Sequence, residues 1–143
     1  MTEVRVEKHF RHPPERVFDA FVDPARVGQW LFRTPGGQMQ RTDYDPHPGG
    51  GFHIVEARAD GPANHWGEFI SLDRPHRIVF DFWTEPSEDR TRVTVTLTAS
   101  GDGCDVVLSH GLAPEWAAYA DRSARGWSMI LDSLSAVIDG AQM

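Results

Sequence analysis

The chain has 143 residues, a formal net charge of -7 and a single cysteine, Cys104. Its length predicts one domain over residues 1–143, its negative charge without a basic run argues against nucleic acid as a partner, and one cysteine excludes an internal disulfide. Residues 1–9 lack an apolar signal core and no stretch has the roughly 20 apolar residues of a membrane span, so we expect a cytoplasmic protein without membrane insertion.

The first predicted elements are a strand and two short helices. Apolar and polar residues alternate over residues 4–10, which is typical of a half-buried strand. A short helix is predicted over 15–22. A second is predicted to start at Asp23-Pro24, an N-cap followed by proline at the first helical position, and to carry Trp30. Both helices are too short to be stable alone, so we expect them to pack on the sheet.

Six further strands are predicted through the middle of the chain. They cover residues 38–44, 52–58, 65–72, 77–84, 92–99 and 105–110. Short turns join consecutive strands and leave no room for a helix between them. The strands are therefore predicted to pair as an antiparallel meander, which excludes a doubly wound parallel sheet.

The last predicted element is a long helix from Ala113 to Ile138. Apolar residues recur there at steps of three or four, the spacing of one helical face: 113, 117, 120, 124, 127, 131, 134 and 137/138. Only the sheet is available to bury this stripe. The predicted fold class is therefore α+β, a curved antiparallel sheet wrapped around a long C-terminal helix, with two short helices after the first strand.

Gly126 lies inside this predicted helix, where glycine costs about 1 kcal/mol relative to alanine. One interpretation is tight packing of the helix backbone on the sheet, and the other is room for a ligand beside Trp127. Charged residues off the apolar stripe, among them Arg122 and Arg125, are predicted to face water.

Short motifs along nearly the whole chain resemble a known family when taken in order. They are Pro14–Phe21 with Asp23-Pro24 and Trp30, Asp45-Pro46 with Gly49-Gly50 and Phe52, Gly67–Phe69, Pro75–Phe80, and Gly126-Trp127 with Leu131 and Leu134. The chain resembles the START-like superfamily, also called SRPBCC or helix-grip. Within it, the chain is most similar to homologues of the activator of the ninety-kilodalton heat-shock chaperone ATPase. The resemblance implies a cavity between sheet and long helix for an apolar or amphipathic small molecule, and it implies no shared catalytic set.

The candidate ligand contacts are residues on the predicted strand faces and on the helix beside this cavity. They are Trp30, Phe52, Ile54, Glu56, Phe69, Phe80, Phe82, Val95, His110, Trp127, Ile130 and Leu131. No catalytic residue, cofactor or metal ligand is predicted.

Several polar residues admit two interpretations. His53, His65 and His110 lie on predicted strands and can converge on zinc, but without a tight ligand spacing hydrogen-bonded or surface histidines are favoured. Glu56, if buried, needs a partner or serves as a general base, and structural pairing is favoured. Cys104 lies far in sequence from any obvious base, which argues against a nucleophilic role.

Three functions follow from these observations. The leading prediction is a binding protein for a hydrophobic small molecule. The alternatives are a chaperone co-factor that binds protein through its outer surface, and an enzyme of the cyclase, dehydratase or hydrolase kind that uses a polar pair such as Glu56 and His110. An exposed edge strand also predicts, more weakly, a homodimer.

Overall fold

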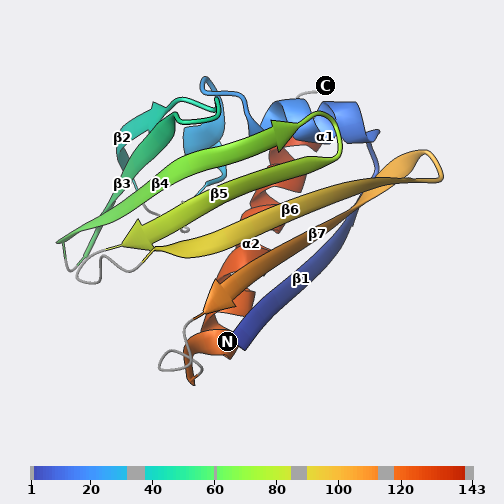
Figure 1. The fold of residues 1–143 in the computed structure, drawn as a ribbon. Coiled ribbons are helices and arrows are strands. Elements are labelled where there is room, and N and C mark those ends of the chain that lie inside the picture. The colour runs from blue at the N-terminus through green and yellow to red at the C-terminus, as the bar shows by residue number, and fades with distance from the viewer. Residues whose placement is uncertain (1, 32–37, 60, 85–89, 113–117, 141–143) are drawn as a thin grey trace.

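The structure is a computed structural model that describes residues 2–31, 38–59, 61–84, 90–112 and 118–140. Within these ranges, seven strands form one antiparallel sheet in the order β1-β7-β6-β5-β4-β3-β2 (Figure 1). The strands are β1 (Thr2–Phe10), β2 (Gln38–Tyr44), β3 (Gly51–Arg58), β4 (Gly61–Asp73), β5 (Arg77–Thr84), β6 (Thr91–Ser100) and β7 (Gly103–Leu112). The predicted antiparallel meander is confirmed from β2 to β7, and β1 closes the order by pairing with β7.

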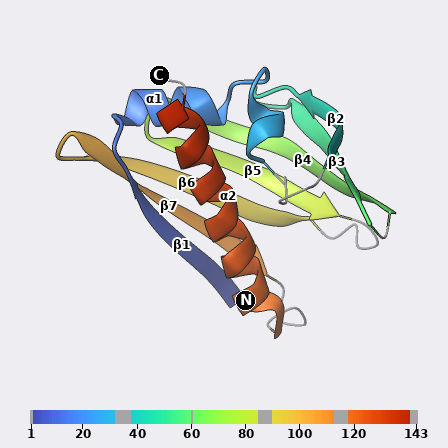
Figure 2. The same cartoon turned by 180° about the vertical axis from the view of Figure 1, so that it is seen from behind.

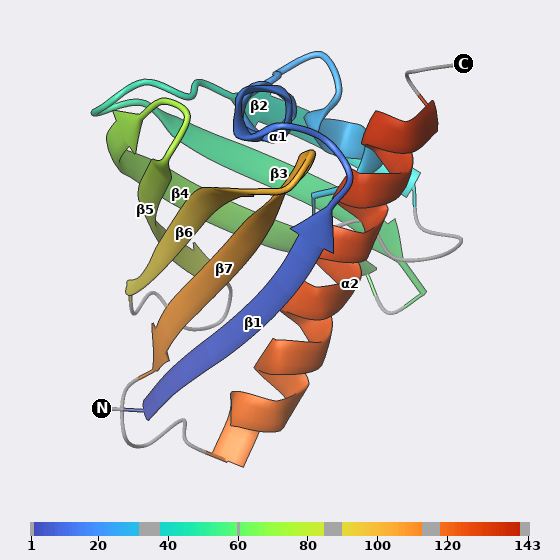
Figure 3. The same cartoon turned by 90° about the vertical axis from the view of Figure 1, so that its right-hand side faces the viewer.

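The sheet is accompanied by α1 (Pro14–Phe21), the 3-10 helix η1 (Val27–Gln29) and α2 (Ala120–Gly140). Figure 2 shows α2 crossing one face of the sheet, with α1 at the far end of that face. In Figure 3 the sheet curves around this side, so that α2 lies against its concave face. The predicted α+β helix-grip architecture is therefore confirmed.

Side chains from the concave face and from α2 form the core. Leu131, Leu134 and Ile138 of α2 are buried in the same apolar cluster as Phe69 and Phe80 of the sheet. The α2 backbone lies closest to the edge strand β1 and also approaches α1 and η1. Large side chains therefore span the wider space between α2 and the middle strands. None of the helices formed by the described residues is long and apolar enough to cross a membrane.

A β-bulge in β4 changes which residues share a face. The pairing of β4 with β5 shifts between Phe69 and Ser71. Simple alternation along the predicted strand 65–72 predicts that Ile70 and Leu72 share one face, and this prediction is wrong. Ile70 is exposed, whereas Leu72 packs against the core, because the bulge inserts an extra residue and reverses the phase of the strand.

Of the predicted helices, α1 is displaced by one residue from the predicted 15–22, and the other two differ more from the observed elements. The second short helix is a single 3-10 turn, because Trp30 leaves the helical region with φ at -137°. Asp23 still begins this segment, and its side chain accepts a hydrogen bond from the Ala25 N–H. The α-helical part of the long helix begins at Ala120 rather than Ala113, and residues 113–117 of that prediction lie outside the described residues.

Candidate ligand-binding cavity

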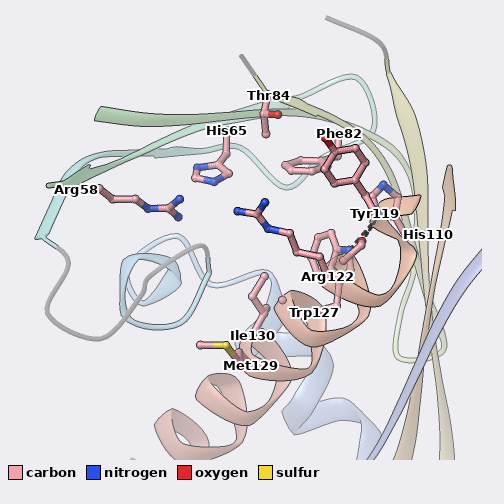
Figure 4. A pocket seen from close by; sticks show the side chains of 12 residues that line it. Arg58, His65, Phe82, Thr84, His110, Tyr119, Arg122, Trp127, Met129 and Ile130 are labelled. Carbon is pink, nitrogen blue, oxygen red and sulfur yellow. Dashed lines mark hydrogen bonds between the residues drawn. The ribbon is translucent and has the colours of Figure 1, made fainter. Parts of the chain in front are cut away.

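A cavity of about 420 Å³ lies between the first half of α2 and the concave face of the sheet. Its wall on the sheet side comes from the ends of β3, β4, β5 and β7, and its other wall from the helix (Figure 4). This volume is within the range of small-molecule pockets. The predicted gap between helix and sheet is therefore present and is not filled by Trp127.

Aromatic and aliphatic side chains form one side of the cavity. Trp127 and Phe82 meet edge to face, with ring centroids 5.8 Å apart, and Trp127 packs in the same way on Phe80 at 6.4 Å. Phe80 is buried beneath this pair. Tyr119 and Ile130 extend the apolar surface along the helix. These rings give an apolar ligand a surface to pack on.

Gly126 lies at the centre of the helical face that lines the cavity. The helical residues on this wall recur at 119, 122/123, 126 and 129/130, which is the spacing of one helical face. A Cβ built on Gly126 meets no atom within 4 Å. Of the two interpretations of this glycine, tight packing on the sheet is wrong, because the space beside it is open.

His110 is held by a directed chain of hydrogen bonds at the cavity wall. The Trp127 Nε1–H, which can only donate, points to His110 Nδ1 at 3.0 Å. His110 Nδ1 is therefore an acceptor, and the ring carries its proton on Nε2, 2.6 Å from Thr91 Oγ1. The Thr91 hydroxyl donates to the Phe82 carbonyl oxygen at 3.2 Å. This arrangement requires neutral His110, and burial lowers the pKa of His110 to about 4.

His65 is a second buried imidazole in the cavity wall. Its Nδ1 lies 3.2 Å from the Ile54 carbonyl oxygen, to which it donates. Burial lowers the pKa of His65 to about 4, against the opposing effect of that hydrogen bond. Both histidines therefore present neutral rings to the cavity at neutral pH.

Two arginines reach the cavity from opposite walls. In Figure 4 the Arg58 and Arg122 side chains extend toward each other below His65. Arg58 Nε donates to Glu56 Oε1 at 2.5 Å, and Glu56 is 0% exposed. The Glu56 carboxylate is therefore structurally paired, as favoured by the sequence, and it holds the arginine in place.

Arg122 carries a charge that the surrounding structure does not balance. Within the described ranges its guanidinium has no hydrogen-bond or ion-pair partner. It lies in the first turn of α2, where a positive charge opposes the helix dipole at a cost of about 0.3–1 kcal/mol. The sequence predicted that Arg122 faces water, and the residue is exposed and also lines the cavity.

The twelve candidate contacts divide between the cavity wall and the packed core. Phe82, His110, Trp127 and Ile130 line the cavity. The apolar remainder is buried in the core cluster: Trp30, Phe52, Ile54, Phe69, Phe80, Val95 and Leu131. Glu56 is buried behind Arg58. Alternation identifies the inner face of a strand, but it does not tell which inner residues meet a neighbour and which border a cavity.

Seven of the described residues that line the cavity, apart from Gly126, were not among the twelve candidates, and only some of them carry a signal in the sequence. Arg58 is in phase with Ile54, His65 with Phe69, and Thr84 with Phe82, so strand alternation places all three on the inner face. All three are polar, so alternation alone does not tell that they border a cavity, and His65 was considered only as a metal ligand. Tyr119, Arg122, Ser123 and Met129 carry no such signal, since they lie beside the apolar stripe of the helix.

The pairing of β3 with β4 places two of the three histidines considered as zinc ligands on different faces of the sheet. His53 is paired with Trp66 and stacks on its ring at 4.9 Å, whereas His65 is paired with Ile54. Adjacent residues of a strand point to opposite faces, so His53 lies on the convex face, away from the other two histidines. Among the described residues, no group of three His, Cys, Asp or Glu side chains is placed to hold a metal ion.

Glu56 and His110, the pair considered as catalytic groups of an enzyme, do not lie close together in the structure. Glu56 lies on β3 and His110 on β7, with β4, β5 and β6 between them. Four strand spacings of about 4.8 Å separate the two strands, which is far beyond hydrogen-bonding range. Cys104 is buried in the core, where burial raises its pKa to about 11, so the thiol stays protonated.

Comparisons with known proteins agree with this architecture. A protein from Rhodobacter sphaeroides is 24% identical, with 97% of this chain and 93% of that chain covered and a TM-score of 0.83. The AHSA1-like protein from Aeromonas hydrophila is 22% identical, covering 99% and 94%, with a TM-score of 0.81. A protein from Chromobacterium violaceum is 23% identical, covering 95% and 96%, with a TM-score of 0.78.

These solved structures show that the fold is shared. No curated protein matches the sequence. The model of the family described as Activator of Hsp90 ATPase homolog 1-like protein matches residues 11–139, and the chain therefore belongs to this family.

Proposed function

We propose that this protein binds a small apolar or amphipathic molecule in the cavity between α2 and the sheet, in the cytoplasm. The observation that carries the proposal is the open space at Gly126, in the middle of the lining face of the helix. Alanine at this position would stabilise the helix relative to glycine, so Gly126 lowers the stability of the helix. The absence of a side chain leaves open volume beside Trp127. Packed aromatic rings on one side and a few polar groups on the other are the usual composition of a ligand pocket.

Filling the cavity from the helix is expected to weaken the binding of an apolar probe. Gly126→Phe places a ring in the open space, and we expect it to lower the affinity for phenylnaphthylamine by about tenfold or more. Phenylnaphthylamine is a neutral dye whose fluorescence rises in apolar surroundings, so a titration of its emission measures the affinity directly.

A matched variant separates filling of the cavity from a general effect of an added aromatic ring. Ser128 is exposed on the same helix and does not line the cavity. Ser128→Phe is therefore expected to bind the dye with wild-type affinity. Equal loss of binding in both variants contradicts the proposal. So does a wild-type protein that binds neither this dye nor its anionic counterpart, anilinonaphthalene sulfonate.

Gly126→Ala is expected to raise the free energy of unfolding by about 0.5–1 kcal/mol, because alanine stabilises a helix relative to glycine.

The family description favours a second candidate function, that of a chaperone co-factor. Such a protein would raise the ATPase rate of the ninety-kilodalton heat-shock chaperone when added in excess. The measurement is the steady-state ATPase rate with and without this protein, and Gly126→Phe serves as a comparison. A rate that does not change rejects the co-factor function, and a rise that survives Gly126→Phe assigns it to a surface other than the cavity.

A further inference from the structure

We propose that the cavity selects an amphipathic anion, whose apolar body packs on Phe82 and Trp127 while its acidic head group lies between Arg58 and Arg122. This inference rests on the proposed binding function and names the class of ligand. A carboxylate matches the planar fork of an arginine, which offers parallel N–H donors to two oxygens.

The charge of the cavity wall is opposite to that of the chain as a whole. The chain carries a formal net charge of -7. The described residues that line the cavity include two arginines and no aspartate or glutamate. The two histidines on the wall are neutral at neutral pH, because burial lowers their pKa to about 4. Glu56, behind the wall, balances the charge of Arg58, so the unbalanced positive charge is that of Arg122. A neutral apolar ligand gives no reason for this charge, whereas an anion does.

Arg58 is prepared for this role by Glu56. The buried carboxylate accepts the Nε–H of Arg58, which fixes the guanidinium and balances its charge. Within the described part of the chain, the terminal nitrogens of Arg58 have no partner, so they remain available to a head group. Glu56 is thus a positioning residue for Arg58 and does not contact the ligand.

Arg122 supplies the charge that is not balanced. It has no partner among the described residues, and its place in the first turn of α2 is electrostatically unfavourable. Its loss is therefore expected to leave the fold intact. In Figure 4 it extends across the cavity toward Arg58 and His65, at the polar end opposite Ile130 and Met129.

The test uses two dyes with one skeleton and different charge. Anilinonaphthalene sulfonate is an anion, and phenylnaphthylamine is the same aromatic system without the sulfonate. We expect Arg122→Gln to lower the affinity for the anionic dye by about fivefold or more and for the neutral dye by no more than about twofold. The ratio of the two affinities is the measured quantity. In the wild-type protein this ratio is expected to fall with added salt, because salt screens the guanidinium.

Arg125 provides the control for charge alone. It lies on the same helix, is exposed and does not line the cavity. Arg125→Gln removes an equal charge and is expected to leave the ratio of affinities unchanged. Competition by dodecanoate and by dodecanol against phenylnaphthylamine repeats the comparison with a carboxylate, and only dodecanoate should lose potency in Arg122→Gln.

The outcomes separate this inference from the binding function on which it rests. If the neutral dye binds and the ratio is the same in the wild-type protein and Arg122→Gln, the anion inference is overturned and the binding function stands. An equal fall of the ratio in Arg122→Gln and Arg125→Gln overturns it as well, because the effect is then that of net charge. If neither dye binds the wild-type protein, the binding function itself fails.

Discussion

Acidification from about pH 7 to about pH 4 is expected to remove about 3 kcal/mol of folding free energy for each of two buried histidines, His65 and His110. Both have a pKa lowered from 6.5 to about 4 in the folded protein, chiefly by burial. Between these values the unfolded chain binds protons that the folded protein does not. Stability is therefore complete above about pH 6.5 and is lost progressively as the pH falls toward 4.

The geometry around each ring explains why it resists protonation. At 5% exposure, His110 accepts the Trp127 N–H, so a proton on Nδ1 would face another donor and break this hydrogen bond. At 8% exposure, His65 lies near Arg58, which opposes a second positive charge, and near Glu56, which favours one. Burial outweighs the attraction of that carboxylate, which is engaged by Arg58.

The measurement is the free energy of unfolding in urea across this pH range. His65→Gln and His110→Gln are each expected to reduce the slope of stability against pH by about 1.4 kcal/mol per pH unit between about pH 4.5 and 6. Ile78→Val is the control, because it removes a buried methyl group at a cost of about 1 kcal/mol without removing a titratable group. Wild-type slopes in both histidine variants contradict the assignment.

Leu131→Ala is expected to lower the free energy of unfolding by about 2–5 kcal/mol. Leu131 is 0% exposed and belongs to the core cluster formed by α2 and the concave face of the sheet. Its truncation removes apolar burial and leaves a void, and the space between α2 and the middle strands is already wide enough to hold a cavity. Urea denaturation at neutral pH measures the change.

Met129→Ala is the matched control for this substitution. Met129 lies on the same helix, two residues earlier, and is 49% exposed. Removal of its side chain is expected to change stability by no more than about 0.5 kcal/mol. A small effect of Leu131→Ala, or an equal effect of the two substitutions, would show that the stripe of α2 does not anchor the helix on the sheet.

The elements of this fold are largely readable from the sequence because their signals are local. Alternating polarity predicted the bounds of β5 as they are observed, and the turn motifs on either side predicted those of β2. The three-to-four spacing placed Trp127, Leu131 and Leu134 on the buried face of α2. Asp81 alternates with Phe80 and Phe82, so the same pattern predicts it on the outer face, where it pairs with the exposed Arg92 across the strands. Periodicity is carried by neighbouring residues, so it needs no knowledge of distant contacts.

The sequence by itself therefore determined the order of the elements and, outside the bulge of β4, the faces that they bury. It also singled out Gly126 as an unfavourable residue inside the long helix. Only the tertiary structure decided where the cavity lies and which residues border it. The α2 backbone approaches β1 and stands away from the middle strands, and the bulges in β2–β3 and β4–β5 accompany the curve of the sheet. Helix placement and sheet curvature result from many packing contacts between residues far apart in the chain, so Arg58 and Arg122 come together at a place that no local pattern marks.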